Sequence, residues 1–367
     1  MRIGIPREIK TLEGRVALVP EATVELVQQG HEVFIERAAG DPSGYPDAAY
    51  QAAGVTLLPD ARSLYDTVEL IVKVKEPIGP ELELLRADHL LFSFLHLAAE
   101  PKLAQCLMEI GLTAVAFETV AVGDELPLLI PMSDIAGRLS IQVGATLLHR
   151  SQGGKGLLLG GLPGVSRGRV VVLGAGTAGR SAVAVAAALG SEVIVFERRR
   201  DRLAQMYHLG QNVTALYPYQ EKLKEAIADA DLLIGAVLQA GARTPRLVSA
   251  EMVRNMRPGS IVVDISVDQG GCIETTRPTT YIEPTYMWEE VVHFAVTNMP
   301  GAVPRSASQA LSSALLPYVL ILSQKGWENH PALAAGINIK AGVVVHAAVQ
   351  ESLAASTQPR STGRKER

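Results

Sequence analysis

Cysteine is scarce in this chain, which has Cys106 and Cys272 among 367 residues. Cysteines so far apart do not suggest a disulfide framework, and no cysteine–histidine cluster has the spacing of a zinc site. Aromatic residues make up 5% of the chain, and its 34 lysines and arginines nearly balance 38 aspartates and glutamates. Without a basic stripe and interleaved aromatic residues, nothing favours nucleic-acid binding. We therefore expect neither a metal site nor a nucleic-acid partner.

Long apolar runs are missing as well. No uncharged apolar segment approaches the roughly 18 residues that a membrane-spanning helix needs. The N-terminus, MRIGIPREIK, lacks the long apolar core of a signal peptide. We therefore expect a cytoplasmic protein without a membrane partner. With 48% hydrophobic and 20% charged residues the chain has the composition of a well-packed protein, and its length favours two domains.

The first third of the chain alternates short apolar runs with amphipathic segments. The runs predict strands, and the segments between them, several of which begin near proline and end at glycine, predict helices. This alternation is typical of a largely parallel sheet covered by helices. The expected strands are 2–6, 31–36, 55–59, 69–75, 89–95 and 113–118, and the expected helices are 20–30, 45–54, 79–87 and 101–111.

A second alternation of the same kind begins at residue 169. It follows a long predicted helix, 131–150, and a glycine-rich connector, 153–168. A final block, 306–326 and 341–356, reads as helical without strand partners of its own, so we expect it to return to the first domain. The expected strands of the second series are 170–174, 191–197, 213–217, 231–237, 259–266 and 293–298.

The second series opens on a glycine motif. Gly174, Gly176 and Gly179 form GAGTAG between a predicted strand and a helix of small residues. The first glycine suits a tight turn, the second lets the backbone approach a pyrophosphate, and the third allows close helix–strand packing. Glu197 ends the next strand, where the acid that binds the adenosine ribose belongs. These features predict a dinucleotide-binding domain.

The acid favours NAD, because a carboxylate accepts hydrogen bonds from the ribose hydroxyls and repels a 2′-phosphate. The next three residues, Arg198 to Arg200, leave an alternative open, since an arginine could bind that phosphate. We interpret these arginines as a solvated helix start. The predicted fold is thus α/β, with two Rossmann-like, doubly wound parallel-sheet domains separated by a cleft and joined by long helices. Residues 1–128 plus 308–367 would form the substrate domain and 129–307 the NAD-binding domain.

Charged residues follow several strands of the first series. Arg7, Lys10 and Arg15 occupy the loop after the first strand, where one arginine could hold a substrate carboxylate. Lys73 and Lys75 end a strand two residues apart, so both are expected on one face of the sheet. A lysine at this edge can polarise a carbonyl, although each of these residues is also compatible with a solvated surface.

Two further strands end near groups that can move protons. His96 closes a strongly apolar strand, and an imidazole there can act as acid or base near neutral pH. In the second series, Asp264 lies within an apolar strand and Asp268 follows it beside two glycines. We expect Asp264 to be structural and Asp268 to be the better candidate for the site.

Seven segments together resemble the alanine dehydrogenase/pyridine nucleotide transhydrogenase family over nearly the whole chain. They are GIPREIKTLEGRVALVP, VKVKEP, PMSDIAGRLS, GGKGLLLGGLPGV, VLGAGTAG, VVDISVDQGGC and VTNMPGAVPRSAS. The resemblance implies NAD-dependent deamination of L-alanine to pyruvate and ammonia, and the reverse reaction, by a homo-oligomer, usually a hexamer.

The resemblance also implies roles for individual residues. Arg15 would bind the substrate carboxylate, Lys75 would bind and polarise the C2 carbonyl, and His96 would donate and accept the proton. Asp268 would orient ammonia or water and stabilise the carbinolamine. The implied cofactor-binding residues are Ser133, Gly174, Gly176, Thr177, Ala178, Gly179, Glu197, Arg202, Val237, Leu238, Asn298 and Met299.

Some positions depart from the family pattern: the loop AAGDPSGYPDAAY, the serines of SASQALSSALLPYV, and Glu197 in place of the more frequent aspartate. A soluble nucleotide-binding subunit of a proton-translocating transhydrogenase is the alternative function. Lys75 and His96 together favour a small amino-acid site over this alternative. The cationic residues argue against a catalytically silent NAD-binding protein, and a saccharopine-type reductase would need a wider cleft for its long substrate.

Overall fold

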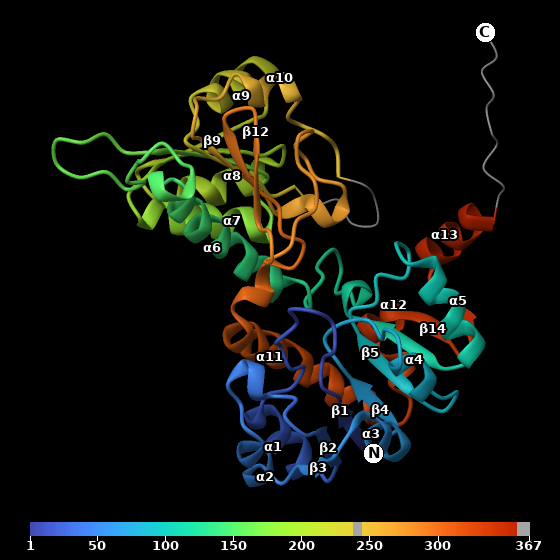
Figure 1. Ribbon diagram of the computed structural model, residues 1–367. Coiled ribbons are helices and arrows are strands. Elements are labelled where there is room, and N and C mark those ends of the chain that lie inside the picture. The colour runs from blue at the N-terminus through green and yellow to red at the C-terminus, as the bar shows by residue number, and fades with distance from the viewer. Residues whose placement is uncertain (238–243, 358–367) are drawn as a thin grey trace. The chain divides into compact units, whose positions relative to one another are not determined.

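The computed structural model describes residues 1–237 and 244–357 (Figure 1). The chain divides into two compact units, which we call unit 1 and unit 2. Unit 1 combines Met1–Pro131 with the chain from Val303 onward, and unit 2 is Met132–Ala302. Each unit is built on one sheet, and each is described below by itself.

Unit 1 contains an eight-stranded sheet in the order β15-β14-β6-β5-β4-β1-β2-β3. β1 to β6 are parallel, whereas β14 and β15 pair in antiparallel fashion. Every residue of β4 and β5 is buried, as expected for central strands covered on both faces. The strands are β1 (Arg2–Ile5), β2 (Glu32–Glu36), β3 (Thr56–Leu58), β4 (Leu70–Val72), β5 (Leu90–Ser93), β6 (Thr113–Ala116), β14 (Ile337–Lys340) and β15 (Val343–Val344).

Four helices of unit 1 begin at proline, namely α1, α5, α11 and α12. Proline suits the first helical position because its fixed φ is helical and the N–H it lacks would have no partner there. The helices are α1 (Pro20–Gln28), α2 (Asp47–Ala52), α3 (Ala61–Thr67), α4 (Glu81–Leu84), α5 (Pro101–Ile110), α11 (Pro304–Leu322), α12 (Pro331–Gly336) and α13 (Ala347–Thr357). Short 3₁₀ turns are η1 (Asp41–Ser43), η2 (Phe117–Thr119) and η6 (Trp327–Asn329).

Unit 2 contains a seven-stranded sheet in the order β12-β13-β11-β10-β7-β8-β9. All neighbours are parallel except β12, which pairs antiparallel with β13 and was not predicted from the sequence. The strands are β7 (Arg169–Leu173), β8 (Glu192–Phe196), β9 (Val213–Leu216), β10 (Leu232–Gly235), β11 (Ile261–Asp264), β12 (Thr285–Trp288) and β13 (Val291–Phe294). The helices are α6 (Ile130–Leu147), α7 (Thr177–Ala188), α8 (Arg200–Tyr207), α9 (Gln220–Ala228) and α10 (Ala250–Arg254), with 3₁₀ turns η3 (Arg150–Gln152), η4 (Ile265–Gln269) and η5 (Met299–Ala302).

The two mostly parallel sheets with their helices confirm the predicted α/β class. The expectation that the C-terminal block lacks strands is wrong. β14 pairs with β6 and β15 extends the same sheet, so residues 341–356 are not one helix. The apolar run at 337–344 is short, and neighbouring helical segments masked its strand character.

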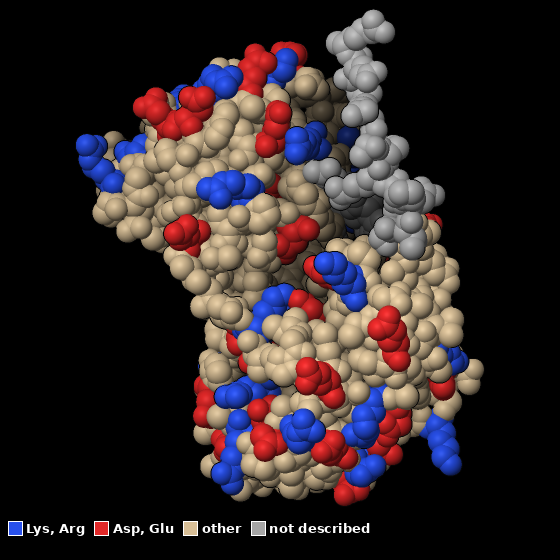
Figure 2. Space-filling model, turned by 45° about the vertical axis from the view of Figure 1, so that its right-hand side comes forward, with Lys and Arg blue, Asp and Glu red and all other residues tan. Residues whose placement is uncertain are grey.

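Lysine, arginine, aspartate and glutamate side chains are interspersed on the face drawn in Figure 2. Among the described residues, no helix is long and apolar enough to cross a membrane.

Candidate functional site

In unit 1, the strand order reverses between β1 and β4, because β2 and β3 continue on one side and β5 and β6 on the other. Ligands of doubly wound sheets bind outside the carboxyl ends of the strands at such a switch point. The predicted residues Arg15, Lys75 and His96 follow β1, β4 and β5, which are neighbours at this point. The fold therefore brings all three to one edge of the sheet.

Arg15 is buried, with its side chain 2% exposed, and it is held by a neighbour in its own loop. Glu13 accepts hydrogen bonds from Arg15 Nε at 2.6 Å and from Arg15 Nη2 at 2.5 Å. Burial by itself would raise the pKa of Glu13, but the bonds and charge of Arg15 outweigh burial, and the pKa is lowered. Glu13 is therefore ionised, and it was missed by the sequence analysis.

Lys75 lies in the loop after β4, where several neighbouring charges shift its pKa. Burial lowers the pKa of its ammonium, and Arg15 and Lys10 act in the same direction. Glu13 and Glu76 oppose this shift. The lowered pKa means that the proton of Lys75 is held less tightly than in water, which suits a group that polarises a substrate oxygen.

Lys73 does not share this environment, and the strand expected at 69–75 is shorter than predicted. β4 ends at Val72, before either lysine. The Lys73 ammonium is 1% exposed and contacts Glu81 at 3.0 Å and Glu8 at 3.4 Å. Lys73 is thus part of a buried ion cluster that joins the loop after β1 to α4.

Glu8 connects the same loops through backbone bonds. It accepts hydrogen bonds from the N–H of Val74 at 2.6 Å and of Lys75 at 3.3 Å. Lys10 pairs in addition with Glu76. These contacts fasten the loop after β1 to the loop after β4, and they fix the backbone that carries Lys75.

His96 lies three residues beyond β5 and is exposed, in contrast to the buried strand before it. Its φ of 50° is in the left-handed region, which is unusual for a residue other than glycine. Glu118, in η2, accepts a hydrogen bond of 2.5 Å from the His96 N–H, and the His96 ring stacks on Phe94. The imidazole is thus oriented yet accessible, as a proton-transfer group must be.

In unit 2, the strand order reverses between β7 and β10. Gly174 follows β7 with φ of +93°, and a Cβ there would lie 2.7 Å from the carbonyl oxygen of Ala236. Gly179 is tighter still, because a Cβ would lie 1.9 Å from the Gly174 oxygen. Val237, just after β10, lies directly beside Gly174, where the Cβ of a side chain would be 3.3 Å from the Val237 Cα. A side chain at position 174 or 179 would therefore collide with the backbone.

Gly176 is the residue before α7, and as a glycine it has no side chain to cap this helix end. Among the residues that the structure describes, a Cβ at Gly176 would meet only the Arg202 guanidinium, at 3.8 Å. Thr177, Ala178 and Gly179 form the first turn of α7, whose N–H groups have no partner in the preceding turn. This end of the helix can therefore bind a pyrophosphate.

Glu197 follows β8 and turns its carboxylate onto the neighbouring loops. It accepts hydrogen bonds from the N–H of Ala175 at 3.0 Å, of Arg198 at 2.7 Å and of Arg199 at 3.0 Å. Nη1 of Arg202 lies 3.6 Å from Oε2 of Glu197. Burial alone would raise the pKa of Glu197, but these N–H groups and Arg202 lower it. The acid is therefore ionised beside the glycine loop.

The remaining predicted residues of unit 2 lie on segments around the same edge. Ser133 is on α6, which touches the first turn of α7, since a Cβ at Gly137 would lie 2.1 Å from the Ala178 oxygen. Asn298 and Met299 follow β13, and Met299 is buried. Leu238 lies outside the described residues.

Asp268 and Asp264 differ in their exposure to solvent. Asp268 is exposed in η4, just beyond β11. Asp264 is fully buried and accepts hydrogen bonds from Ser266 N, Cys272 N and the Thr276 hydroxyl. These local bonds support a structural role for Asp264.

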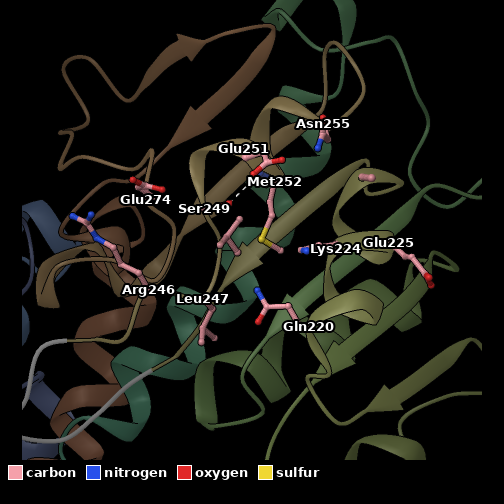
Figure 3. Close-up of a pocket in the computed structure, with 12 residues that line it drawn as sticks. Gln220, Lys224, Glu225, Arg246, Leu247, Ser249, Glu251, Met252, Asn255 and Glu274 are labelled. Carbon is pink, nitrogen blue, oxygen red and sulfur yellow. Dashed lines mark hydrogen bonds between the residues drawn. The ribbon is translucent and has the colours of Figure 1, made fainter.

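A separate pocket of about 730 Å³ lies beside α9 and α10. Lys224 and Arg246 lie around it together with Glu225, Glu251 and Glu274 (Figure 3). The residues that line it include none of the predicted site residues, and its mixed charges favour no ligand class.

Comparison with known proteins supplies the family. The model "Alanine dehydrogenase/PNT, N-terminal domain" matches residues 4–136, and "Alanine dehydrogenase/PNT, C-terminal domain" matches residues 140–347. The chain belongs to the alanine dehydrogenase/PNT family. This confirms the family predicted from the sequence and, with it, the prediction of an oxidoreductase.

The relatives resemble the chain over nearly its full length. The alanine dehydrogenase of Halomonas elongata is 46% identical over 96% of each chain. A solved L-alanine dehydrogenase superposes with a TM-score of 0.94 at 49% identity and covers 97% of this chain and 99% of its own. The transhydrogenase from Sinorhizobium meliloti matches with a TM-score of 0.83 at 26% identity, over 95% of this chain and 100% of its own.

Proposed function

We propose that this chain catalyses the NAD-dependent oxidative deamination of L-alanine to pyruvate and ammonia, and the reverse reductive amination. The observation that carries the proposal is the position of Arg15, Lys75 and His96, which follow three neighbouring strands at the switch point of unit 1. Relatives that are 44–49% identical are named alanine dehydrogenase, which supports the same assignment.

Each of these side chains has a role that fits its surroundings. Arg15 binds the substrate carboxylate, because a guanidinium forms paired hydrogen bonds with a carboxylate. Lys75 binds the C2 oxygen of pyruvate and stabilises the negative charge that develops on it. His96 is accessible and oriented, and it accepts the proton of the water that adds to C2 and donates a proton to the departing amine.

The reaction consumes water and releases ammonia. C2 of alanine loses a hydride, water adds to the resulting iminium, and the carbinolamine releases ammonia and becomes pyruvate. In the reverse direction the same groups act on pyruvate and ammonia. Asp268, in unit 2, orients the ammonia or water and stabilises the carbinolamine.

Unit 2 is proposed to bind NAD. The fit rests on the glycine loop, where a Cβ at position 174 or 179 would collide with backbone, and on the uncapped start of α7. Gly174 to Gly179, with Thr177 and Ala178, would hold the pyrophosphate, and Ser133 would contact it from α6. When bound, the nicotinamide accepts or donates the hydride.

The two ends of the dinucleotide would contact different residues. Glu197 and Arg202 would hold the adenosine ribose, and Val237 and Leu238 would flank the adenine or ribose. Asn298 and Met299 would border the nicotinamide ribose and ring. The ionised Glu197 supports NAD rather than NADP, because its negative charge opposes a 2′-phosphate.

The protein is also proposed to be a cytoplasmic homo-oligomer, a hexamer by family resemblance. An apolar loop of unit 2 supports self-association, since Leu158, Leu162 and Val165 are each more than half exposed. Exposed apolar side chains clustered on one segment are typical of protein–protein contacts.

The proposal is tested by following NADH formation at alkaline pH with the purified full chain, NAD and L-alanine. Glycine, L-serine and D-alanine serve as comparison substrates. We expect a rate restricted largely to L-alanine and lost in His96→Ala. No reduction of NAD by L-alanine, with NAD still bound, would contradict the proposal.

One observation favours a second function, a soluble nucleotide-binding subunit of a transhydrogenase. The solved transhydrogenase matches 95% of this chain with a TM-score of 0.83. Its 26% identity is well below the 49% identity of the solved L-alanine dehydrogenase, so the first function is favoured. Binding of NAD without turnover of any amino acid would instead support the second.

A further inference from the structure

Glu13 and Arg15 form a buried ion pair with an unusual layout. Their side chains are 1% and 2% exposed, and two bonds of 2.6 and 2.5 Å join the Glu13 carboxylate to Nε and Nη2 of Arg15. Glu13 also accepts a bond of 3.1 Å from the Arg15 N–H. Three bonds to one carboxylate fix the plane of the guanidinium relative to its own backbone.

The bonds between Glu13 and Arg15 join two residues of one loop, so these bonds by themselves link no distant segments of unit 1. Other contacts fasten that loop: Val16 N–H to the Ser308 hydroxyl at 2.9 Å, and the Ser43 hydroxyl to the Gly14 oxygen at 2.6 Å. A buried ion pair is also weak support for stability, since desolvation offsets its attraction. Stability therefore does not explain the pair well.

The position of Glu13 in the charge pattern suggests a different role. The charges of Arg15, Lys10, Glu13 and Glu76 act on the Lys75 ammonium, and Lys10 pairs with Glu76. Glu13 is thus the carboxylate that balances Arg15, and its charge favours the protonated form of Lys75. The Glu8 carboxylate accepts a hydrogen bond from the Lys75 N–H, so it also lies beside this residue.

We infer that Glu13 is a positioning residue for the proposed reaction: its carboxylate orients the Arg15 guanidinium for the substrate carboxylate and supplies negative charge beside Lys75. The inference rests on the proposed function, because it assigns Arg15 and Lys75 to pyruvate and alanine. Glu13 then has two separable effects: it sets the orientation of the Arg15 guanidinium, and it places a negative charge beside Lys75.

The test compares Glu13→Gln and Glu13→Asp with the wild type in the reductive amination of pyruvate by NADH and ammonium. Glu13→Gln removes the charge and one acceptor, so we expect KM for pyruvate to rise about 10- to 100-fold. The alkaline limb of kcat/KM should move down by about one pH unit, because Lys75 loses a charge that holds its proton.

Glu13→Asp keeps the charge on a shorter side chain. We expect it to restore the alkaline limb and to restore KM only in part. Glu69→Gln is the matched control, since Glu69 forms an exposed pair with Arg2. NADH affinity, measured by fluorescence, should stay near the wild-type value in both Glu13 variants. The unfolding midpoint of Glu13→Gln should fall, because Arg15 stays buried without its carboxylate.

A folded Glu13→Gln that keeps both KM and the alkaline limb would overturn the inference and leave the proposed function intact. If Glu13→Gln does not fold, Glu13→Asp decides: an unchanged KM overturns the geometric role. A wild-type protein that binds NADH but does not reduce pyruvate would instead remove the proposed function, and the inference with it.

Discussion

The carboxyl edges of the two sheets are built from different chemical groups. In unit 1, charged side chains gather after β1 and β4, and most of them are buried against one another, as in the cluster of Lys73, Glu8 and Glu81. In unit 2, the edge after β7 is glycine and backbone N–H, and the charge of Glu197 is bonded to three of these N–H groups.

The difference reflects two kinds of task. Polarising a carbonyl and moving a proton require ionisable groups with adjusted proton affinity, which burial and neighbouring charges provide. Holding a pyrophosphate requires close approach of the backbone and a helix start, which side chains would obstruct. Substitutions in unit 1 should therefore change chemistry or charge balance, whereas substitutions in unit 2 should change cofactor affinity.

The largest expected effect is at His96. His96→Ala should lower kcat by about 10²- to 10⁴-fold, because an acid–base group at the reacting carbon is lost. NADH affinity and the unfolding midpoint should hardly change, since the side chain is exposed. A loss of kcat of about tenfold or less would contradict the proton-transfer role of His96.

The next largest effect concerns stability in unit 1. Lys73→Met leaves Glu8 and Glu81 buried without their cation, so the free energy of unfolding should fall by about 3–5 kcal/mol. Burial tends to lower the pKa of Lys73, but the two carboxylates raise it. The stabilisation is therefore fully present at neutral pH and lost as pH rises through the raised pKa. Urea unfolding at pH 7, with Arg2→Met as surface control, measures it.

Substitutions at two glycines of unit 2 distinguish an effect on folding from an effect on cofactor binding. Gly179→Ala forces a Cβ to within 1.9 Å of the Gly174 oxygen, and it should cost about 1–3 kcal/mol of stability. Gly176→Ala meets no backbone and should fold normally, yet weaken NADH binding about tenfold by holding the pyrophosphate away. Equal NADH affinity in Gly176→Ala and wild type would argue against the assigned pyrophosphate position.

The smallest expected effect is on the choice between NAD and NADP. Glu197→Gln removes a negative charge beside Arg202, so the ratio of kcat/KM for NADP to that for NAD should rise about tenfold. Asp201→Asn is the control, because Asp201 pairs with Arg199 at the surface. An unchanged ratio would mean that Glu197 holds its loop without selecting the cofactor.

The sequence predicted the strands of both series well because their apolar runs are short, bounded and repeated. It also predicted the glycine loop, since Gly174 and Gly179 stand where any Cβ would collide. It missed Glu13 and Glu118, although both follow strands, because their roles depend on contacts with Arg15 and His96 that no local pattern shows. It also missed the different surroundings of Lys73 and Lys75. These depend on contacts with Glu8, which lies in another loop.

The sequence by itself determined the family, the α/β class and the residue types at the strand ends, because these follow from local periodicity and motif spacing. The tertiary structure decided which charges meet. Glu8 contacts the loop of Lys75 across 67 residues of chain, and β14 joins β6 from the other end of the sequence. Contacts of this kind depend on how distant segments pack, and no local pattern encodes them.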